Sequence, residues 1–403
     1  MIRDKLTHFV QFLENPKHPL LGPNLKGLSF GGMWLKGPNL WICFQKFVNF
    51  FTFFFVVSQF MEAYNIRNDF NRLLQNLSIT ILSFTCYSKC MAFVFRLKRW
   101  SELFHSISEE EISCIQSGDK KVIVLMKEYI KYSRFITYSY WILVSVTNAA
   151  MMIAPVFKLF SSANYRKEVQ QGILPYPEML SSWFPFDNTK MPGYFFACLV
   201  HVSMCSKGAA ITAVFDTNAV AIMVFLKGQM IILEEKCKNI FHNCKSRKEA
   251  LRRIKECHRQ HNFILRTHQT FDALLSPIMF LYVLICSMTI CFSVVQYVSA
   301  GVTISYKIWI IEYTIAQVSQ LFLFCWHSND VLLESKAISE SVYLSDWWKT
   351  DKILQKQTLI LAGKMNRVVI FNAGPYTTLT IPTFIEILKG AYSFFTLFSQ
   401  IQE

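Results

Sequence analysis

Seven long runs of apolar residues alternate with shorter polar segments along the 403-residue chain. A helix needs about 20 residues to cross the ~30 Å hydrocarbon core of a bilayer, and each run reaches that length. The first run contains the stretch from Phe50 to Val57, which holds five phenylalanines and would not suit a water-exposed surface. The pattern therefore predicts an all-α membrane protein with seven transmembrane helices, at about 39–61, 73–95, 135–157, 194–226, 273–298, 308–328 and 376–400.

The composition agrees with a membrane protein. Hydrophobic residues make up 52% of the chain and charged residues 17%, against the roughly 25% charged residues of an ordinary soluble domain. The first 26 residues alternate charged residues and prolines without a sustained apolar core. We therefore expect no cleavable signal peptide and a cytosolic N-terminus.

Most of the 41 Lys and Arg residues lie in segments that a cytosolic N-terminus places inside the cell. The segment from Lys227 to Arg266, between the fourth and fifth runs, has eleven of them. Cytoplasmic loops are enriched in Lys and Arg, so this distribution predicts an extracellular C-terminus. It also explains the net charge of +14 without nucleic acid as a partner, because 227–266 has the pattern of an amphipathic helix that continues the fourth run.

Helical patterns also occur outside the predicted spans, at 100–116, 247–272 and 333–366. We expect these helices to pack as a cytosolic bundle, which would form a base for oligomerisation. The predicted organisation is residues 1–328 for helices one to six with a ligand-binding outer half, 329–375 for cytosolic anchor helices, and 376–403 for a pore-lining seventh helix. The outer loop at about 158–193 is rich in proline and aromatic residues, which is typical of a loop packed on helix ends or of a lid over a ligand entrance.

Sequence motifs of enzymes and metal sites are absent. Neither G-x-S-x-G nor H-E-x-x-H occurs, so hydrolase chemistry has no support. The group Cys257, His258, His261 and His268 lacks a second pair of ligands at metal-site spacing and is typical of a solvated helix face. We therefore expect no enzymatic activity, no bound metal and no cofactor.

Charged residues inside the predicted spans are informative, because each is costly in a bilayer unless it is paired or faces a cavity. Lys89 lies near the inner leaflet, where its side chain is expected to extend to the membrane surface. Lys207, Asp216 and Glu312 lie deeper. They are candidates for a buried salt bridge or hydrogen bond, or for contact with a ligand.

A second set of polar and aromatic residues lies in the outer halves of the second, third, fourth and sixth runs. On neighbouring helices they would line an apolar cavity with a few hydrogen-bonding groups, the usual composition of a small-molecule site. Ordinary helix packing is the alternative for each of them. The candidate ligand-binding residues are Thr80, Ser83, Phe84, Tyr87, Ser145, Asn148, Ala149, Met152, Phe195, Cys198, His201, Cys205, Trp309, Tyr313 and Gln317.

The last run has the pattern of a pore-lining helix. Ser393, Leu397, Gln400 and Ile401 recur at intervals of three to four residues and share one face. Rings of bulky apolar residues block ions by dewetting, and polar neighbours hydrate the conduit. One helix cannot enclose a pore, so several subunits would have to surround a common axis. A helix packed within its own bundle is the alternative.

The last third of the chain resembles the insect odorant receptors, a family of seven-helix ligand-gated cation channels. Residues 320–329, QLFLFCWHSN, are similar to the sixth helix of that family, and residues 343–348, YLSDWW, to its tyrosine–tryptophan signature before the seventh helix. Further similarity lies in Lys356 and Gln357 through Arg367, in Ala373 and Gly374, in Phe384, and in Tyr392 to Leu397. Weaker similarity extends upstream through Asp216 and Thr217.

The resemblance implies a tetramer in the plasma membrane of a sensory neuron dendrite, opened by a small volatile odorant and permeable to cations. It implies a pocket among helices two, three, four and six, and a hydrophobic gate at Leu397 and Ile401 with Gln400 beside it. The co-receptor of the family has a longer insertion between helices four and five. The short link here favours an odorant-tuning subunit that assembles with the co-receptor.

Two other functions remain open at this point. The first, a gustatory-type ligand-gated channel, is the more similar to an odorant receptor, and the Ser-Phe…Gln-Ile pattern in the last run favours it. A G-protein-coupled chemoreceptor would need the N-terminus outside the cell, against the charge distribution. The sequence also has neither an Asp-Arg-Tyr near the inner end of the third run nor an Asn-Pro-x-x-Tyr in the seventh.

Overall fold

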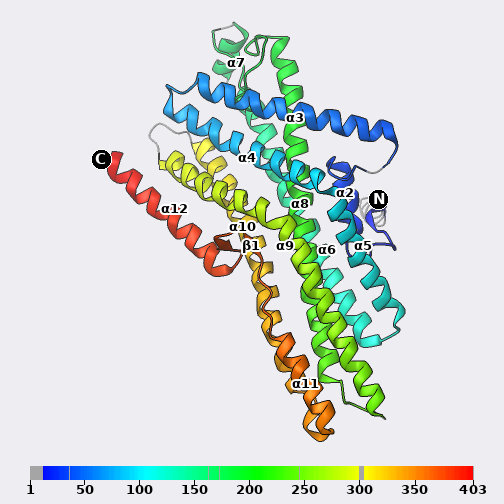
Figure 1. The fold of residues 1–403 in the computed structure, drawn as a ribbon. Helices are drawn as coiled ribbons and strands as arrows, with labels where there is room; N and C mark the ends of the chain where they lie inside the picture. The colour runs from blue at the N-terminus through cyan, green and yellow to red at the C-terminus, as the bar shows by residue number, and fades with distance from the viewer. Residues whose placement is uncertain are drawn as a thin grey trace.

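Helices account for nearly all of the computed structural model (Figure 1), which describes residues 12–402 except 36, 162, 172, 245 and 299–303. Several helices are far longer than a bilayer requires. The elements are α2 (Gly22–Phe30), α3 (Asn39–Asn65), α4 (Phe70–Phe95), α5 (Leu97–Gln116), α6 (Lys120–Ser161), α7 (Ala163–Gln170), α8 (Gly193–Lys238), α9 (Arg247–Val298), α10 (Ile304–Tyr343), the 3-10 turn η1 (Trp347–Lys349), α11 (Lys352–Met365), the strands β1 (Asn372–Ala373) and β2 (Thr377–Thr378), and α12 (Ile381–Gln402).

Within the described residues, six helices are long and apolar enough to cross a membrane: α3, α4, α6, α8, α9 and α10. They contain the first six predicted runs. The seventh run corresponds to α12, which has 22 residues and begins at Ile381, five residues after the expected position. The fold is the predicted seven-helix, all-α membrane architecture.

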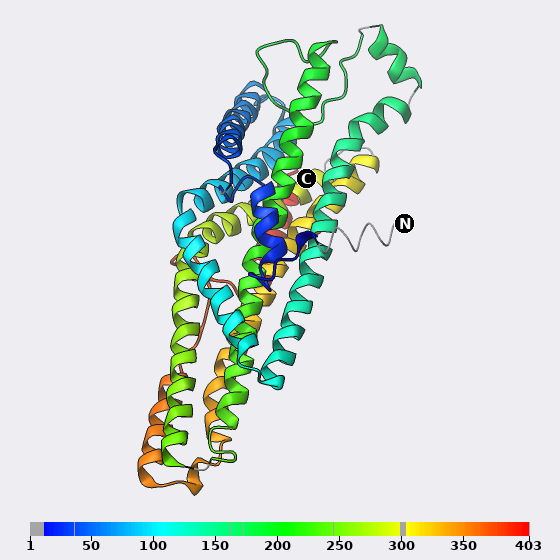
Figure 2. The same ribbon diagram turned by 90° about the vertical axis from the view of Figure 1, so that its right-hand side faces the viewer.

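The central helix of the molecule is α8. In the most apolar 18-residue window of α8, 83% of the residues are buried, against 11% in the corresponding window of α6. Helix α8 therefore fills the core, while α6 faces outward. It packs against α2, α4, α6, α9 and α10, and Figure 2 shows it running the length of the molecule beside α6. With 46 residues it spans roughly 69 Å at 1.5 Å per residue, well beyond a bilayer.

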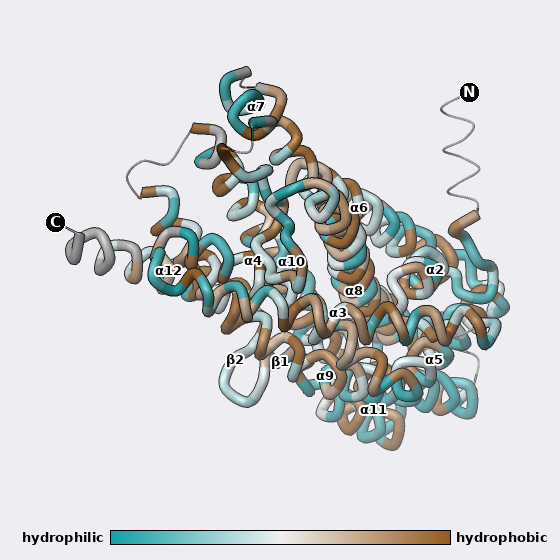
Figure 3. Tube along the Cα trace, turned by 90° about the horizontal axis from the view of Figure 1, so that it is seen from above, coloured by the Kyte–Doolittle hydropathy of each residue, from teal (hydrophilic) through white to brown (hydrophobic). Residues whose placement is uncertain are grey.

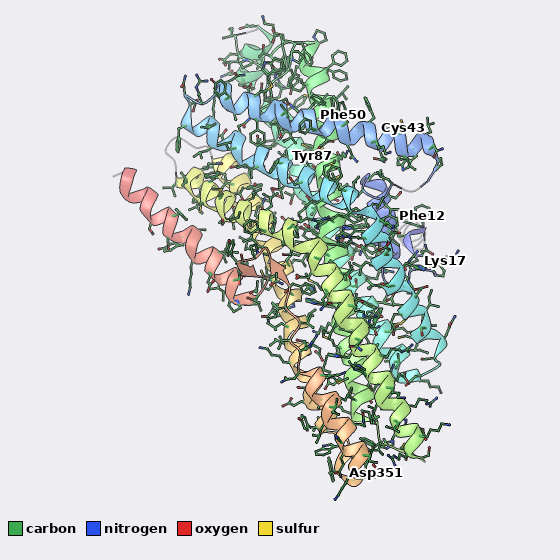
Figure 4. All side chains as sticks on the ribbon, viewed as in Figure 1. Phe12, Lys17, Cys43, Phe50, Tyr87 and Asp351 are labelled. Carbon is green, nitrogen blue, oxygen red and sulfur yellow. The ribbon has the colours of Figure 1, made fainter. Side chains whose placement is uncertain are left out.

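One end of the molecule is a bundle formed by α11 and by the ends of α8, α9 and α10 (Figure 1). Asp351, labelled at this end in Figure 4, caps α11 by accepting hydrogen bonds from the backbone N–H groups of Ile353 and Leu354 at 3.0 and 2.8 Å. Lys227 of α8 also lies 2.8 Å from Asp330 of α10. Two of the three helical patterns expected to pack as a bundle, 247–272 and 333–366, contribute to it. The third, 100–116, belongs to α5, which packs on α6 and α9 instead.

A β-hairpin separates the bundle from α12. The strands pair antiparallel, with Asn372 opposite Thr378 and Ala373 opposite Thr377. Gly374 has a φ of 72°, and a Cβ atom there would lie 2.6 Å from the ring of Phe280, so this turn requires glycine.

The hairpin is held against α9 by polar contacts. Asp272 accepts hydrogen bonds from the backbone N–H and from the side-chain amide of Asn372, both at 2.8 Å. Nearby, Pro277 has no N–H to offer the carbonyl of Ala273, which accepts a 3.0 Å hydrogen bond from Arg96 instead. The start of α12 is therefore fixed to the middle of α9.

The remainder of α12 projects from the edge of the molecule (Figures 1 and 3). It contacts α9 and α10. Ala391 is buried, and the ring of Phe384 packs on that of Phe322 in α10 with centroids 5.5 Å apart. On other faces Tyr392 and Phe394 are 67% and 57% exposed, so this helix presents aromatic surface.

Candidate functional site: an intramembrane cavity

A cavity of about 160 Å³ lies among α3, α4, α6, α8 and α10. Each helix contributes residues spaced three or four apart, so each presents one face to the space. Helices two, three, four and six of the membrane domain were expected to form such a cavity. The structure adds helix one, through Thr52, Phe55 and Val56, and the outer loop, through Leu180.

Seven of the fifteen predicted ligand-binding residues lie on the cavity wall. Tyr87 of α4, labelled in Figure 4, stands on the α3 side, where its ring centroid is 5.8 Å from that of Phe53. On α10, Trp309 and Tyr313 stack with centroids 5.6 Å apart. The seven are Ser83, Tyr87, Asn148, Cys205, Trp309, Tyr313 and Gln317. Their role in ligand binding stays a prediction.

The other eight lie elsewhere. His201 is buried under the outer loop, where its ring accepts or donates a 2.7 Å hydrogen bond with Ser182. The hydroxyl of Thr80 donates to the side chain of Asn76. Phe84 and Phe195 are exposed, as are Ser145 and Ala149, and Met152 and Cys198 are half-buried away from the cavity wall.

The misplaced residues follow two physical patterns. On α6 the wall is formed by Leu143, Val144, Thr147, Asn148 and Met151, so the predicted face is rotated by about one residue, or 100°. On α8 the wall runs from Met204 to Thr212, one to two turns deeper than expected. Hydropathy does not determine how a helix is rotated or how deep a cavity lies, because both depend on packing partners.

Several wall residues were missed. Tyr140 and Gln320 close the inner end, Gly208 and Ala209 widen the space on α8, and Leu180 covers the outer end. For the missed residues of α8, the sequence does contain an indication. Cys205, Gly208 and Thr212 continue a single stripe of small residues along α8 at the spacing of one helical face.

The inner end of the cavity is built on a buried ion pair. The Nζ atom of Lys89 lies 2.7 Å from Oδ1 of Asp216, and the two side chains are 1% and 0% exposed. Lys89 was expected to extend to the membrane surface, and that prediction was wrong. A charge buried this deeply requires a partner, and the carboxylate on α8 supplies it. Lys207, the other candidate cation, donates to the side-chain oxygen of Asn49.

The outer loop closes the opposite end. Leu180 is buried and lines the cavity, and backbone contacts fix its neighbours. The amide of Asn76 donates to the carbonyl of Ser181 at 2.9 Å, and the N–H of Trp183 donates to the carbonyl of Ser58 at 3.2 Å. The loop is therefore packed on helix ends, as one of the two expectations stated, and Leu180 lines the cavity. Its role as a lid over a ligand entrance stays a prediction.

The predicted pore residues lie on the distal part of α12. Ser393 is exposed, and its hydroxyl donates to the carbonyl of Lys389 at 3.0 Å. The side chains of Leu397, Gln400 and Ile401 lie outside the described residues, although the helix itself continues to Gln402. Their role at a gate stays a prediction.

Comparisons with known proteins agree on one family. The profile of the 7tm odorant receptor family matches residues 69–392. Odorant receptor Or2 of Anopheles gambiae is 20% identical over 352 residues, covering 86% of this chain and 89% of the relative. Odorant receptor 10 of Aedes albopictus is 21% identical over 363 residues, covering 88% and 90%.

The fold agrees as well. The structure of the olfactory receptor OR5 from Machilis hrabei in complex with eugenol superimposes with a TM-score of 0.81, covering 94% of this chain and 97% of that one at 12% identity. A second structure of the same receptor matches with a TM-score of 0.80. The match of the family profile over most of the sequence, together with this fold, shows that the chain belongs to the insect family of 7tm odorant receptors.

Proposed function

We propose that this protein is the odorant-tuning subunit of a ligand-gated cation channel, and that a small volatile molecule binds in the cavity. The observation that carries the proposal is the cavity itself, about 160 Å³ in size. Apolar cavities of about 150 Å³ accommodate benzene, so the space suits a molecule of one ring or a short aliphatic chain. Related OR5 was solved in complex with eugenol, a molecule of this class.

The chemistry of the wall supports the same ligand class. Most of its residues are apolar or aromatic, and a few hydrogen-bonding groups stand among them, including Tyr87, Asn148 and Gln317. Such a wall favours an uncharged ligand with one or two polar atoms, because a charged ligand would lose its hydration without a matching partner.

The proposed channel is a tetramer in the plasma membrane of a sensory neuron dendrite, formed with a co-receptor subunit. The exposed aromatic surface of α12, including Tyr392 and Phe394, supports contacts between subunits around a common axis. Leu397 and Ile401 would form its hydrophobic gate, with Ser393 and Gln400 as polar neighbours in the path of the cations. A ligand that binds the open arrangement more tightly than the closed one would open it.

Ligand-evoked current tests this function. Cells would express the protein with an insect odorant co-receptor, the protein alone, or the co-receptor alone, and would be exposed to eugenol and to a panel of single-ring aromatic and short aliphatic volatiles. We expect inward cation current only from the co-expressing cells, for a subset of the panel. Correct surface delivery in these cells without any response beyond the co-receptor alone would contradict the proposal.

A further inference from the structure

The inner end of the cavity is a hydrogen-bonded junction of four helices. Asp216 of α8 binds Lys89 of α4 through Oδ1. Its other oxygen, Oδ2, accepts a 3.0 Å hydrogen bond from the hydroxyl of Tyr140 in α6 and a second from the carboxamide of Gln320 in α10. One buried carboxylate thereby ties four helices together, and its two neutral donors are themselves part of the cavity wall.

The carboxylate is the fixed member of this junction. Lys89 is buried with it, and its Nζ atom also stands over the ring of Tyr282 in α9, 4.9 Å from the centroid. Separating the two charges would leave each buried and unpaired, which is among the largest single penalties in a protein core. The bonds from Tyr140 and Gln320 are made by neutral donors, so they are the weaker ties, which a ligand in the cavity can replace.

Gln320 lies two residues before Phe322, through which α10 contacts α12. Successive residues of a helix are 100° apart, so Gln320 and Phe322 point to nearly opposite sides of α10. Phe322 packs on Phe384 near the start of α12, with ring centroids 5.5 Å apart. Since α10 continues from Ile304 to Tyr343 with neither proline nor glycine, a shift of the helix at Gln320 also moves Phe322.

We propose that the hydrogen bond from Gln320 to Asp216 holds α10 in the resting arrangement, and that a ligand at the inner end of the cavity releases it and so moves α12. This proposal rests on the function proposed above, and it names the residue through which ligand binding in the cavity would act on α12. The ligand contacts the carboxamide of Gln320 in place of Asp216, which gives it the differential affinity that a shift between two states requires. Gln320 is then a positioning residue, which acts on the pore through Phe322.

Basal current in the absence of ligand tests the proposal. Gln320→Met keeps the length of the side chain and removes the donor. A hydrogen bond to a charged acceptor is strong enough that its loss is expected to lower the ratio of closed to open channels by roughly tenfold. Current would be recorded from cells that also express the co-receptor, normalised to surface labelling, and corrected for leak by replacing external Na⁺ with an impermeant cation.

Two matched variants separate transmission from general damage. Gln296→Met removes another buried glutamine, which bonds to Ser78 at 2.9 Å and is not itself on the cavity wall, and is expected to leave basal current unchanged. Tyr140→Phe removes the other neutral donor to the same oxygen of Asp216 without altering α10. It is expected to raise basal current less than Gln320→Met does. An equal rise would assign the effect to the carboxylate itself and overturn the proposal.

Phe322→Ala tests the same proposal at a position outside the packed core. This side chain is 41% exposed. The variant is expected to raise basal current, and its effect is not expected to add to that of Gln320→Met, because both would act on one contact. Unchanged current in Phe322→Ala would overturn the proposal even if Gln320→Met did not reach the surface. Where both variants reach it, simple additivity of their effects would also overturn the proposal. Failure of the wild-type protein to add any ligand-evoked current would instead reject the function on which this proposal rests.

Discussion

At the residue scale, Glu111 of α5 is an ionisable group outside the predicted spans whose pKa departs far from its ordinary value. It is fully buried and accepts hydrogen bonds from the N–H of Leu20 at 3.2 Å and from the hydroxyl of Tyr129 at 3.1 Å. Arg134, which pairs with Glu14 at 2.7 Å, is the nearby cation. Burial raises the pKa of the Glu111 carboxyl from 4.5 to about 7, and the two hydrogen bonds and Arg134 only partly oppose this.

This raised pKa predicts a pH-dependent stability. The folded protein keeps the Glu111 proton at pH values where the unfolded chain has lost it, so stability falls as the pH rises from about 4.5 to about 7. Glu111→Gln is expected to flatten that part of the profile, measured as thermal unfolding of the detergent-solubilised protein between pH 5 and 8. Glu102→Gln, at an exposed position of the same helix, is the control. A profile of Glu111→Gln that follows the wild type would contradict the prediction.

A second prediction at this scale concerns the cavity. A Cβ atom at Gly208 would have the sulfur of Cys86 at 4.0 Å as its nearest neighbour, so alanine fits and a longer side chain enters the cavity. Gly208→Leu is expected to raise the half-maximal ligand concentration roughly tenfold or more, since a single methylene in such a pocket already changes binding by about 1–3 kcal/mol. Leu199→Phe, at a 51% exposed position of α8, is expected to leave the concentration–response curve unchanged.

At the element scale, the structure depends on how closely the other helices approach α8. One close approach of α6 is at Gly228, where an added Cβ atom would lie 2.4 Å from the ring of Tyr129. Where a side chain of one helix packs this closely on the backbone of another, the second helix needs a glycine at the contact. The same helix pair carries the cavity wall farther along, so their separation affects the site as well as stability.

Gly228→Ala is therefore expected to destabilise the protein by about 1–3 kcal/mol, the usual cost of overpacking a core. Gly363→Ala in α11 meets no atom within 4 Å and is expected to be neutral or stabilising, because alanine is the better helix former. Thermal unfolding in detergent would compare the two. Equal melting temperatures for Gly228→Ala and the wild type would show that the ring of Tyr129 moves aside without cost.

At the scale of the whole molecule, the long helices join three regions: the cavity, the bundle beyond the membrane and α12. Both α8 and α10 border the cavity and continue into the bundle. α12 is attached at its base, through the hairpin to α9 and through Phe384 to α10. In the proposed channel, a movement of α10 at the cavity would therefore be passed to α12 along a continuous helix.

The orientation of the molecule is tested directly by labelling. The distribution of Lys and Arg predicts that a tag at Met1 is inaccessible to antibody in intact cells and that a tag after Glu403 is accessible. Permeabilised cells serve as the control, in which both tags should be labelled. Labelling of the Met1 tag in intact cells would reverse the topology and exclude the proposed channel arrangement.

The sequence by itself determined the seven helices, because each apolar run is long enough to cross a bilayer, and the resemblance in its last third indicated the family. Individual site residues were less predictable. On α10 the stripe of Trp309, Tyr313 and Gln317 does lie on the cavity wall, since a spacing of four residues places all three on one face of the helix.

Only the tertiary structure decided the rest. The rotation of α6, the depth of the cavity along α8 and the pairing of Lys89 with Asp216 depend on contacts between residues far apart in the chain, 76 positions for Tyr140 and Asp216 and 127 for Lys89 and Asp216. No periodicity within one helix encodes which neighbour its faces meet, because the same apolar stripe packs on lipid or on protein with similar free energy.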